Sequence, residues 1–255
     1  MKISALFAHT ISASKWLPAI ALGCSLSASG LADDTTASKE KEDAKKSAYK
    51  AETERFDHTV REDLFAGFEG DEEALKRGMQ ACEDALKEKP DHAEALVWRG
   101  AARIYVSGEA FQKGDFQAGM KNWTSGLEDV DKAVELEPNN IGVLIPRAAV
   151  LLPAGRSAPK AMGLPLLHRV KKDFERTYER QKDMLDKIGE HPLGELRMGL
   201  ADVYRALGEG EKSRGQLEAV IKELPDTAYS SRAKDWLAAP AEKKLAHNCI
   251  GCHSS

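Results

Sequence analysis

The chain has 255 residues, of which 42 % are hydrophobic and 31 % charged, and its formal net charge is −4. This composition is typical of a soluble protein that forms one large domain or a short repeat array. The acidic balance leaves no basic footprint for a nucleic acid, so we expect no nucleic-acid partner.

The N-terminal stretch, residues 1–32, has the pattern of a secretory signal peptide. Lys2 and Lys15 supply positive charge, and the apolar core Trp16–Leu26 is too short to span a bilayer. The sequence Gly30-Leu31-Ala32 then offers a cleavage site before Asp33. We therefore predict export to the periplasm. A retained N-terminal anchor is the alternative that this stretch leaves open.

A second alternative to simple cleavage is lipid attachment at Cys24. The sequence Ala-Leu-Gly-Cys at 21–24 is similar to a bacterial lipobox, although the usual first Leu is missing. A lipid on this cysteine would hold the protein in the cell envelope. Membrane association is expected only in that case.

Residues 33–55 are polar and charged and contain almost no large apolar side chains. Such a segment cannot bury enough apolar surface to offset the conformational entropy lost on folding. We predict that it is a disordered linker between the signal peptide and the folded part of the chain.

From residue 56 to residue 239 the apolar residues follow a helical period, and three segments end in the same way. Residues 85–90, 133–138 and 220–225 each read as an amphipathic helix closed by a proline. This pattern resembles the end of the tetratricopeptide repeat, a 34-residue helix–turn–helix unit. The best full match is 194–227.

Within 194–227 the key positions of that repeat are mostly occupied as the family implies. Ala201 stands where a small residue lets the two helices approach, and Tyr204 where an aromatic ring packs between them. Gly208 follows the first helix as its C-terminal cap. The signature Trp is absent, because Arg197 occupies its position.

The unit from 93 to 138 is longer than the repeat, and the excess lies between Val106 and Trp123. Asp115 is predicted to cap a lengthened second helix. An apolar stripe follows at helical spacing, which we interpret as core: Phe116, Met120, Trp123, Leu127, Val130 and Val134.

The third unit is the least regular. A helix is predicted over 141–152, then a loop over 153–165, because three prolines and two glycines fall there, and then a long helix over 166–188. The alanine-rich segment 227–239 reads as a capping helix whose Trp236 covers the last apolar face. A weaker first repeat precedes these units.

The resemblance implies an all-α, tetratricopeptide-like α-solenoid of about three and a half repeats, which binds protein partners in its groove. No acid–base or nucleophile constellation is apparent, so we expect no enzyme. Cys82 lies on the apolar face of a predicted helix, and we interpret it as a packing residue.

The C-terminal tail, residues 240–255, carries the sequence Cys249-Ile-Gly-Cys252-His253. It resembles the attachment signature of the c-type cytochromes. The resemblance implies a covalent haem c, with thioethers to Cys249 and Cys252 and with His253 as the proximal ligand of the iron. A redox partner would follow from this. Export supports it, because haem is attached outside the cytoplasmic membrane in that family.

Two other chemistries suit the pair of cysteines. Cys249 and Cys252 could form a disulfide or a redox dithiol, and such a pair can also be half of a zinc site. The sequence does not identify the distal ligand of a haem. Met162 is a weak candidate because it lies in the predicted loop, and His168, His191 and His58 are weaker still.

The sequence thus favours an exported repeat scaffold with one covalent haem on its tail, used for electron transfer or redox-linked protein assembly. The alternative is a haem-free periplasmic interaction scaffold with a Cys249–Cys252 disulfide or dithiol. A haem sensor with an open iron site is a third hypothesis.

Overall fold

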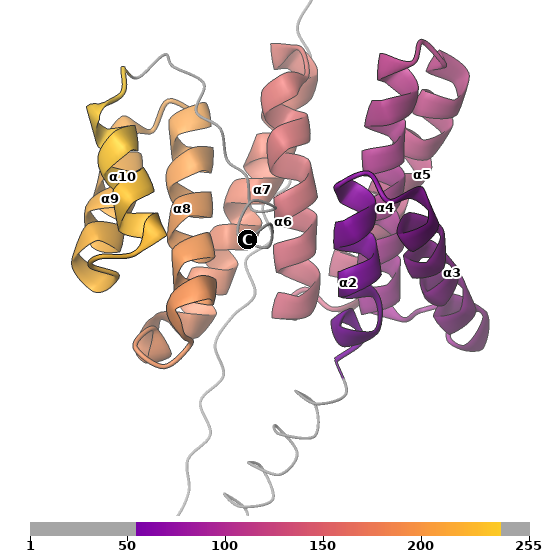
Figure 1. Cartoon of the computed structure of the whole chain (residues 1–255), viewed down its shortest axis with the longest axis horizontal. Helices are drawn as coiled ribbons and strands as arrows, with labels where there is room; N and C mark the ends of the chain where they lie inside the picture. The colour runs from indigo at the N-terminus through magenta and orange to yellow at the C-terminus, as the bar shows by residue number, and fades with distance from the viewer. Residues whose placement is uncertain (1–54, 241–255) are drawn as a thin grey trace, which may run out of the picture. The chain divides into compact units, whose positions relative to one another are not determined.

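The computed structural model describes residues 55–240, and this part of the chain is helical without a strand (Figure 1). The predicted signal peptide, nearly all of the predicted linker and the Cys-x-x-Cys-His motif lie outside the described residues. No helix within 55–240 is both long and apolar enough to cross a membrane.

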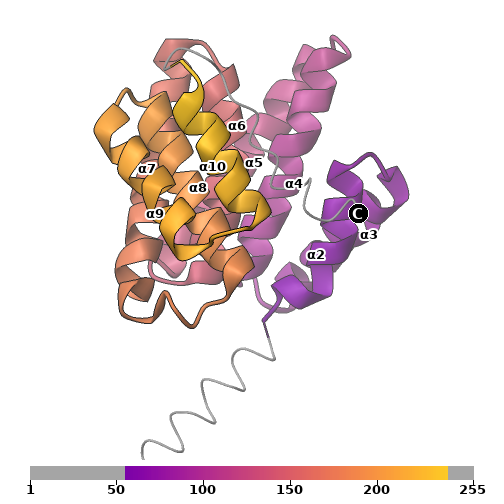
Figure 2. The same ribbon diagram turned by 60° about the vertical axis from the view of Figure 1, so that its left-hand side comes forward.

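The helices of the described region pack as consecutive pairs, each pair a hairpin of neighbours in sequence (Figures 1 and 2). The pairs are α2 (Asp57–Phe68) with α3 (Glu72–Glu88), α4 (Ala93–Gln112) with α5 (Phe116–Leu136), α6 (Ile141–Ser157) with α7 (Lys160–Gln181), and α8 (Glu190–Ala206) with α9 (Gly210–Glu223). A short 3-10 turn, Lys182–Met184, follows α7, and α10 (Ala228–Ala238) packs on α9. The predicted all-α helical-repeat architecture is confirmed. The described residues form four hairpins and a closing helix, against the expected count of about three and a half repeats.

Several helices begin with a side chain that caps their first turn. The Asp115 side chain accepts a hydrogen bond of 2.9 Å from the backbone N–H of Ala118, so the predicted cap of α5 is confirmed. Asp71, His92, Asn140 and Thr227 cap other helices in the same way. Gly208 follows α8 with φ of +78°, a left-handed conformation that glycine adopts without strain.

The hairpin α8–α9 contains the repeat unit predicted at 194–227, and its key positions are packed as expected. Ala201 is fully buried, and the Ser213 hydroxyl donates a 2.7 Å hydrogen bond to its carbonyl oxygen. This short contact requires small side chains on both helices. Tyr204 is also buried, and its hydroxyl donates to Glu175 of α7.

The predicted loop over 153–165 is wrong. Helix α6 continues through Pro146 and Pro153 to Ser157, and α7 begins at Lys160 and includes Pro165. Only two residues separate the helices. The glycines of this region serve an interhelical contact instead: a Cβ on Gly163 would overlap the carbonyl oxygen of Gly155, so the two backbones touch.

The packing around this contact explains why the prolines are tolerated. A proline inside a helix costs on the order of 3 kcal/mol, because it removes a hydrogen bond and crowds the preceding turn. Leu151 and Leu152 of α6 and Leu166 and Leu167 of α7 are almost completely buried. Burial of several such side chains at about 2 kcal/mol each outweighs that cost. The long helix predicted to reach residue 188 ends earlier, at Gln181.

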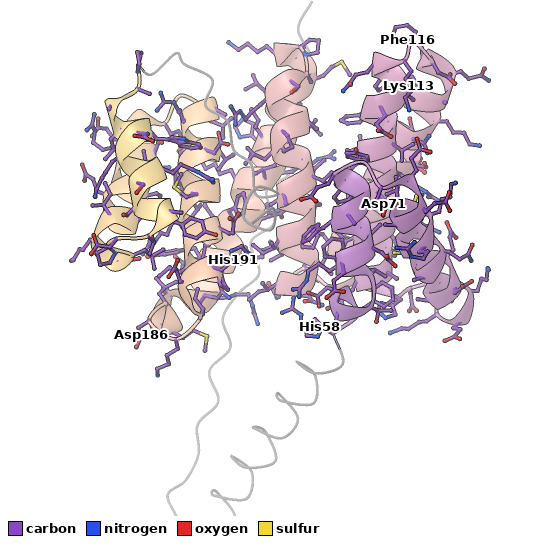
Figure 3. All side chains as sticks on the ribbon, viewed as in Figure 1. His58, Asp71, Lys113, Phe116, Asp186 and His191 are labelled. Carbon is purple, nitrogen blue, oxygen red and sulfur yellow. The ribbon has the colours of Figure 1, made fainter. Side chains whose placement is uncertain are left out.

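The apolar stripe of α5 is only partly core. Val130 is buried and Trp123 is half-buried, as predicted, but Phe116 is 69 % exposed and Met120 is 50 % exposed. Phe116 lies at the tip of the α4–α5 hairpin (Figure 3). There it contacts the ring of Phe111 on α4, with centroids 6.2 Å apart. The prediction was wrong for the first turns of α5 because the lengthened hairpin leaves this face uncovered.

The closing helix has its predicted role. Trp236, Ala233 and Tyr229 are buried against α8 and α9, and Leu237 is half-buried. The Tyr229 ring lies on Gly194, where a Cβ would come within 2.5 Å of the ring. Glycine at this position therefore lets α10 pack closely on α8 (Figure 2).

The glycine contact between α6 and α7 gives a stability prediction. Gly163→Ala should lower the free energy of unfolding by about 1–3 kcal/mol, because its Cβ meets backbone that cannot move aside. Gly215→Ala on α9 is the matched control, since nothing lies within 4 Å of its Cβ position. That variant should gain up to about 1 kcal/mol from helix propensity. Urea denaturation of both variants measures the difference, and equal effects would contradict the contact.

Candidate functional site

The predicted haem ligands Cys249, Cys252 and His253 lie outside the described residues. Within 55–240, no group of three or more His, Cys, Asp or Glu side chains comes together as a metal site would require. The described part of the candidate site therefore consists of the point where the tail begins and of the side chains near that point.

The start of the tail is held by one side chain, Arg205, in the last turn of α8. Its guanidinium donates hydrogen bonds to the carbonyl oxygens of Trp236 at 3.3 Å and Ala239 at 3.4 Å, and also to Pro240. These carbonyls at the end of α10 have no partner within that helix. A cation at a helix C-terminus is also favoured by the helix dipole. Arg205 thus fixes the direction in which the tail leaves α10.

The same region of α8 is connected to the third hairpin. Asp202, one turn before Arg205, accepts a 2.7 Å hydrogen bond from Arg156 in the last turn of α6. The Asp202 carboxylate is nearly buried, with 4 % of its side chain exposed. The C-terminal end of α6 therefore contacts α8 one turn before the residue that holds the start of the tail. Sequence reasoning missed both arginines, because each one reads as a solvated residue near a helix end.

The candidate distal ligands are on the surface. Met162 is 54 % exposed, and it lies in the first turn of α7, not in an irregular loop as predicted. His168 on the same helix is exposed, and so is His58, whose Nε2 lies 3.8 Å from Asp57. Met162 can therefore no longer be favoured because of an irregular loop, and what remains is that its thioether is accessible.

His191 differs from the other candidates because it belongs to a hydrogen-bond chain. Its Nδ1 lies 2.7 Å from the hydroxyl of Tyr229, and that hydroxyl donates to Glu195 at 2.9 Å. This hydrogen-bond chain joins the first turns of α8 to the start of α10. It satisfies a buried tyrosine hydroxyl, which is what docking of the closing helix requires.

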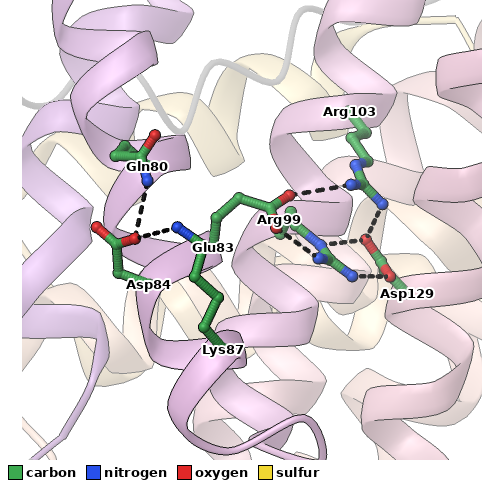
Figure 4. Close-up of polar contacts among 7 residues, drawn as sticks. All are labelled: Gln80, Glu83, Asp84, Lys87, Arg99, Arg103 and Asp129. Atoms are coloured by element: carbon green, nitrogen blue, oxygen red, sulfur yellow. Dashed lines mark hydrogen bonds and ion pairs between the residues drawn. The ribbon is translucent and has the colours of Figure 1, made fainter.

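A recurring arginine forms the most extensive polar structure of the described region. Arg99 on α4 donates to both carboxylate oxygens of Asp129 on α5, at 2.9 and 2.7 Å, and to Glu83 on α3 at 3.1 Å. Arg103 bridges the same two acids (Figure 4). These two guanidinium groups thus connect the α4–α5 hairpin to the preceding hairpin.

The same arrangement occurs in the next hairpin. Arg147 on α6 donates to both oxygens of Asp173 on α7, each at 2.7 Å, and to Asp131 on α5 at 3.0 Å. Asp131 also accepts from Arg169 at 2.8 Å. The third and preceding hairpins are therefore joined by a buried guanidinium.

In the fourth hairpin Arg197 on α8 donates to both oxygens of Glu223 on α9, at 3.0 and 2.8 Å. Toward the preceding hairpin it faces an aromatic ring, with its guanidinium carbon 5.0 Å from the centroid of Tyr178. We call Arg99, Arg147 and Arg197 the arginine ladder. Its signal in the sequence is an arginine on the first helix of each of these three hairpins, with the paired acid on the second helix.

The innermost pair of the ladder is costly to bury. Only 8 % of the Arg147 side chain and 1 % of the Asp173 side chain are exposed. Burial raises the pKa of Asp173 above its ordinary value, although the Arg147 guanidinium opposes that shift. Arg147 is therefore the main compensation for the lost hydration of this carboxylate, and the charge of Arg176 adds to it.

A shallow hollow of about 500 Å³ lies beside the ladder. It is lined by Leu96 of α4 and, on α5, by Glu128, Asp129, Asp131, Lys132 and Glu135. The two aspartates are already paired with ladder arginines, and Lys132 pairs with Glu135 at 3.4 Å. No nucleophile lines the hollow, and we assign it no catalytic role.

Cys82 is the cysteine of the described region, and it is a packing residue as predicted. It is fully buried on α3, and burial raises the pKa of its thiol to about 12. A protonated, inaccessible thiol is neither a nucleophile nor a metal ligand.

Comparison with known proteins gives no match. No family model matches the sequence, and neither a curated protein nor a solved structure resembles it at a significant level. The functional argument therefore depends on the residues of this chain alone.

The buried pair of the ladder yields a pH-dependent prediction. Arg147→Met should lower the free energy of unfolding by about 3–5 kcal/mol at neutral pH, because Asp173 is left buried without compensation. Loss of the arginine should also raise the pKa of Asp173 further. The folded state then holds its proton more tightly than the unfolded state does, so the variant loses stability as pH rises through that raised pKa. At pH values below that raised pKa, the difference in the free energy of unfolding between the variant and the wild type should become smaller.

The control for this experiment is Arg77→Met. Arg77 pairs with Asp63 at 2.6 Å, but 60 % of its side chain is exposed, so its loss should change stability little at any pH. Chemical denaturation of both variants at several pH values makes the comparison. A gap between Arg147→Met and wild type that stays constant with pH would rule out Asp173 as its source.

Proposed function

We propose that this protein is an exported helical-repeat scaffold that carries one covalent c-type haem on its C-terminal tail. It would serve electron transfer or redox-linked protein assembly with a protein partner. The observation that carries the proposal is the sequence Cys249-Ile-Gly-Cys252-His253 in a chain that also begins with a secretory pattern.

The donor set suits this group. Two thiols at this spacing match the covalent attachment of a haem, and an adjacent imidazole matches the proximal ligand of its iron. Cys82 does not compete for the attachment, because its thiol is buried in α3. This leaves Cys249 and Cys252 as the pair that an exported chain presents for maturation.

When bound, a haem supplies one-electron chemistry. Cys249 and Cys252 would hold it on the tail, and His253 would ligate its iron. Met162 remains a candidate for the distal side, because its thioether is exposed. The repeat helices would contribute the surface that a protein partner binds.

The location follows from the N-terminal pattern. We propose that the mature protein is periplasmic, with attachment to the envelope through Cys24 as the alternative. No helix of the described region could add a membrane span.

The decisive experiment expresses the full chain with its export signal in a host that has haem-maturation machinery. The intact mass should equal the cleaved chain plus one haem, and a pyridine haemochrome spectrum should report thioether-linked haem. Cys249→Ala and Cys252→Ala should each abolish the normal doubly linked product. Cys82→Ala is the matched control, and it should keep the haem because that thiol is buried.

A mass equal to the cleaved apoprotein would overturn the proposal. The alternative, a haem-free scaffold, would then stand, and thiol titration with and without reductant would show whether Cys249 and Cys252 form a disulfide or a free dithiol.

A further inference from the structure

The described residues expose four large hydrophobic side chains, and three of them lie near the turns that join two neighbouring hairpins. Phe116 and Met120 are 69 % and 50 % exposed in the first turns of α5, and Met162 is 54 % exposed in the first turn of α7. The fourth, Met184, follows the opposite end of α7. We call Phe116, Met120 and Met162 the turn patch. Large apolar side chains grouped on a surface mark an interaction site more often than single ones do.

The turn patch spans two parallel helices that run side by side. Arg169 of α7 pairs with Asp131 of α5 across 38 residues of sequence, and a second contact between the two segments, seven residues later, keeps the same offset. Helix α7 therefore runs beside α5 in the same direction. By this offset Met162 lies at the level of residue 124 of α5, about one turn from Met120. The exposed side chains thus belong to one area of the surface.

The tip of the α4–α5 hairpin projects beyond the first hairpin. Figure 3 shows Lys113 and Phe116 at the far end of α4 and α5, well past the α2–α3 turn, where Asp71 lies. The Phe116 ring contacts Phe111, with centroids 6.2 Å apart. Phe111 in turn covers Gly119, where a Cβ would come within 2.5 Å of the ring. The exposed aromatic ring is therefore supported from below on a projecting tip, which suits entry into a soft surface.

Three exposed lysines surround the turn patch, and within the described residues no carboxylate pairs with any of them. Lys113 belongs to the α4–α5 turn, Lys121 lies in the second turn of α5, and Lys160 is the first residue of α7. Lysines elsewhere in the described region commonly pair with an acid, as Lys76 does with Glu73 at 2.6 Å. The three ammonium groups thus add positive charge to the apolar patch.

Acids are scarce in this part of the sequence. Asp115, beside the patch, is the N-cap of α5 and accepts a hydrogen bond from the backbone of Ala118. Residues 156–172 contain five Lys and Arg and no Asp or Glu; three of the five pair with acids of other elements, and Lys160 does not. The formal net charge of the whole chain is −4. The turn patch is therefore a basic and apolar area on an acidic protein.

This combination fits an anionic membrane surface better than a protein partner. Exposed Phe and Met side chains are stabilised by entering the boundary between headgroups and acyl chains, and lysines at the same level attract anionic lipids. Protein interfaces are enriched in Phe and Met too, but lysine is depleted in them. Here lysines flank both the α5 part and the α7 part of the patch.

From this arrangement we propose that the turn patch docks the folded protein on an anionic lipid bilayer. Phe116 and Met120 enter the interface, and Lys113, Lys121 and Lys160 face the headgroups. The contact is peripheral, because no helix of the described region could span the bilayer. It adds a route to the membrane that needs neither a lipid anchor nor a haem, so it is independent of the proposed function.

Binding to lipid vesicles tests the docking. The full-length chain is exported with Cys24→Ser, which prevents lipid attachment, and is sedimented with vesicles of phosphatidylglycerol and phosphatidylcholine in equal parts or of phosphatidylcholine alone. Binding should be several-fold stronger on the anionic vesicles. It should also fall as salt is added, because ions screen the attraction between the lysines and the headgroups.

The apolar part of the patch is tested by Phe116→Gln combined with Met120→Gln. This variant should bind anionic vesicles about tenfold more weakly, because two apolar side chains no longer enter the lipid. Glutamine favours helix, so α5 should stay folded, which circular dichroism verifies. Met184→Gln is the matched control: this methionine is 47 % exposed but lies outside the patch, so binding should be unchanged.

The charged part is tested by Lys113→Gln, Lys121→Gln and Lys160→Gln. Each substitution should weaken binding to anionic vesicles by about fivefold, because it removes one charge near the headgroups. Lys187→Gln is the control, since this lysine is exposed near Met184 and should not contact the bilayer.

Several outcomes would overturn the inference. These are equal binding to the two kinds of vesicle, full binding by the Phe116 and Met120 variant, or an equal loss in the Met184 control. Absence of binding to either vesicle would overturn it as well, and self-association that the same variant abolishes would then identify a second copy as the occupant. Covalent haem is measured separately by mass, so none of these results changes the standing of the proposed function.

Discussion

The arrangement of the hairpins depends on buried guanidinium groups. In three consecutive hairpins an arginine of the first helix holds a carboxylate of the second helix in a bidentate pair. The same guanidinium also contacts the preceding hairpin, through a further N–H to Glu83 or Asp131 or through its face on the ring of Tyr178. Lysine could not replace it, because only the planar guanidinium offers several fixed donors and a face for stacking. The ladder therefore fixes the register between hairpins as well as within them.

In the fourth hairpin the ladder arginine stands at the position where the predicted repeat would carry a Trp. Arg197 occupies that position and is 6 % exposed, so it fills space as the Trp would. The difference is that its charge must be compensated, which ties the position to Glu223. Close contacts of glycine complete the interfaces: a Cβ on Gly100 would lie 2.8 Å from the carbonyl oxygen of Gly126, and one on Gly199 would meet the ring of Phe174. Small residues allow the helix backbones to approach closely, and the arginine ladder limits how far the packed helices can shift along one another.

The sequence predicted the helices wherever a single face of apolar residues decided the structure. The units at 93–138 and 194–227, the cap at Asp115 and the closing helix all follow from local periodicity and capping chemistry. The prediction of a loop at 153–165 was wrong because a segment rich in proline and glycine can form either a loop or a tight contact between two helices. The prediction that Phe116 and Met120 are core residues was wrong, because periodicity identifies the apolar face of a helix but not whether a neighbouring helix covers it. The arginine ladder was missed for a related reason: a charged residue is usually solvated, and only tertiary packing shows that these are buried.

The candidate site likewise has a part that local sequence determines and a part that depends on long-range contacts. The Cys-x-x-Cys-His motif could be found in the sequence because its two thiols and its imidazole lie within five residues and need no fold to bring them together. The contacts at the start of the tail could not be predicted from the sequence, because they depend on Arg205 and Asp202, whose partners are distant in sequence. Those contacts fix where the tail starts, and nine residues then limit how far its cysteines can lie from α8.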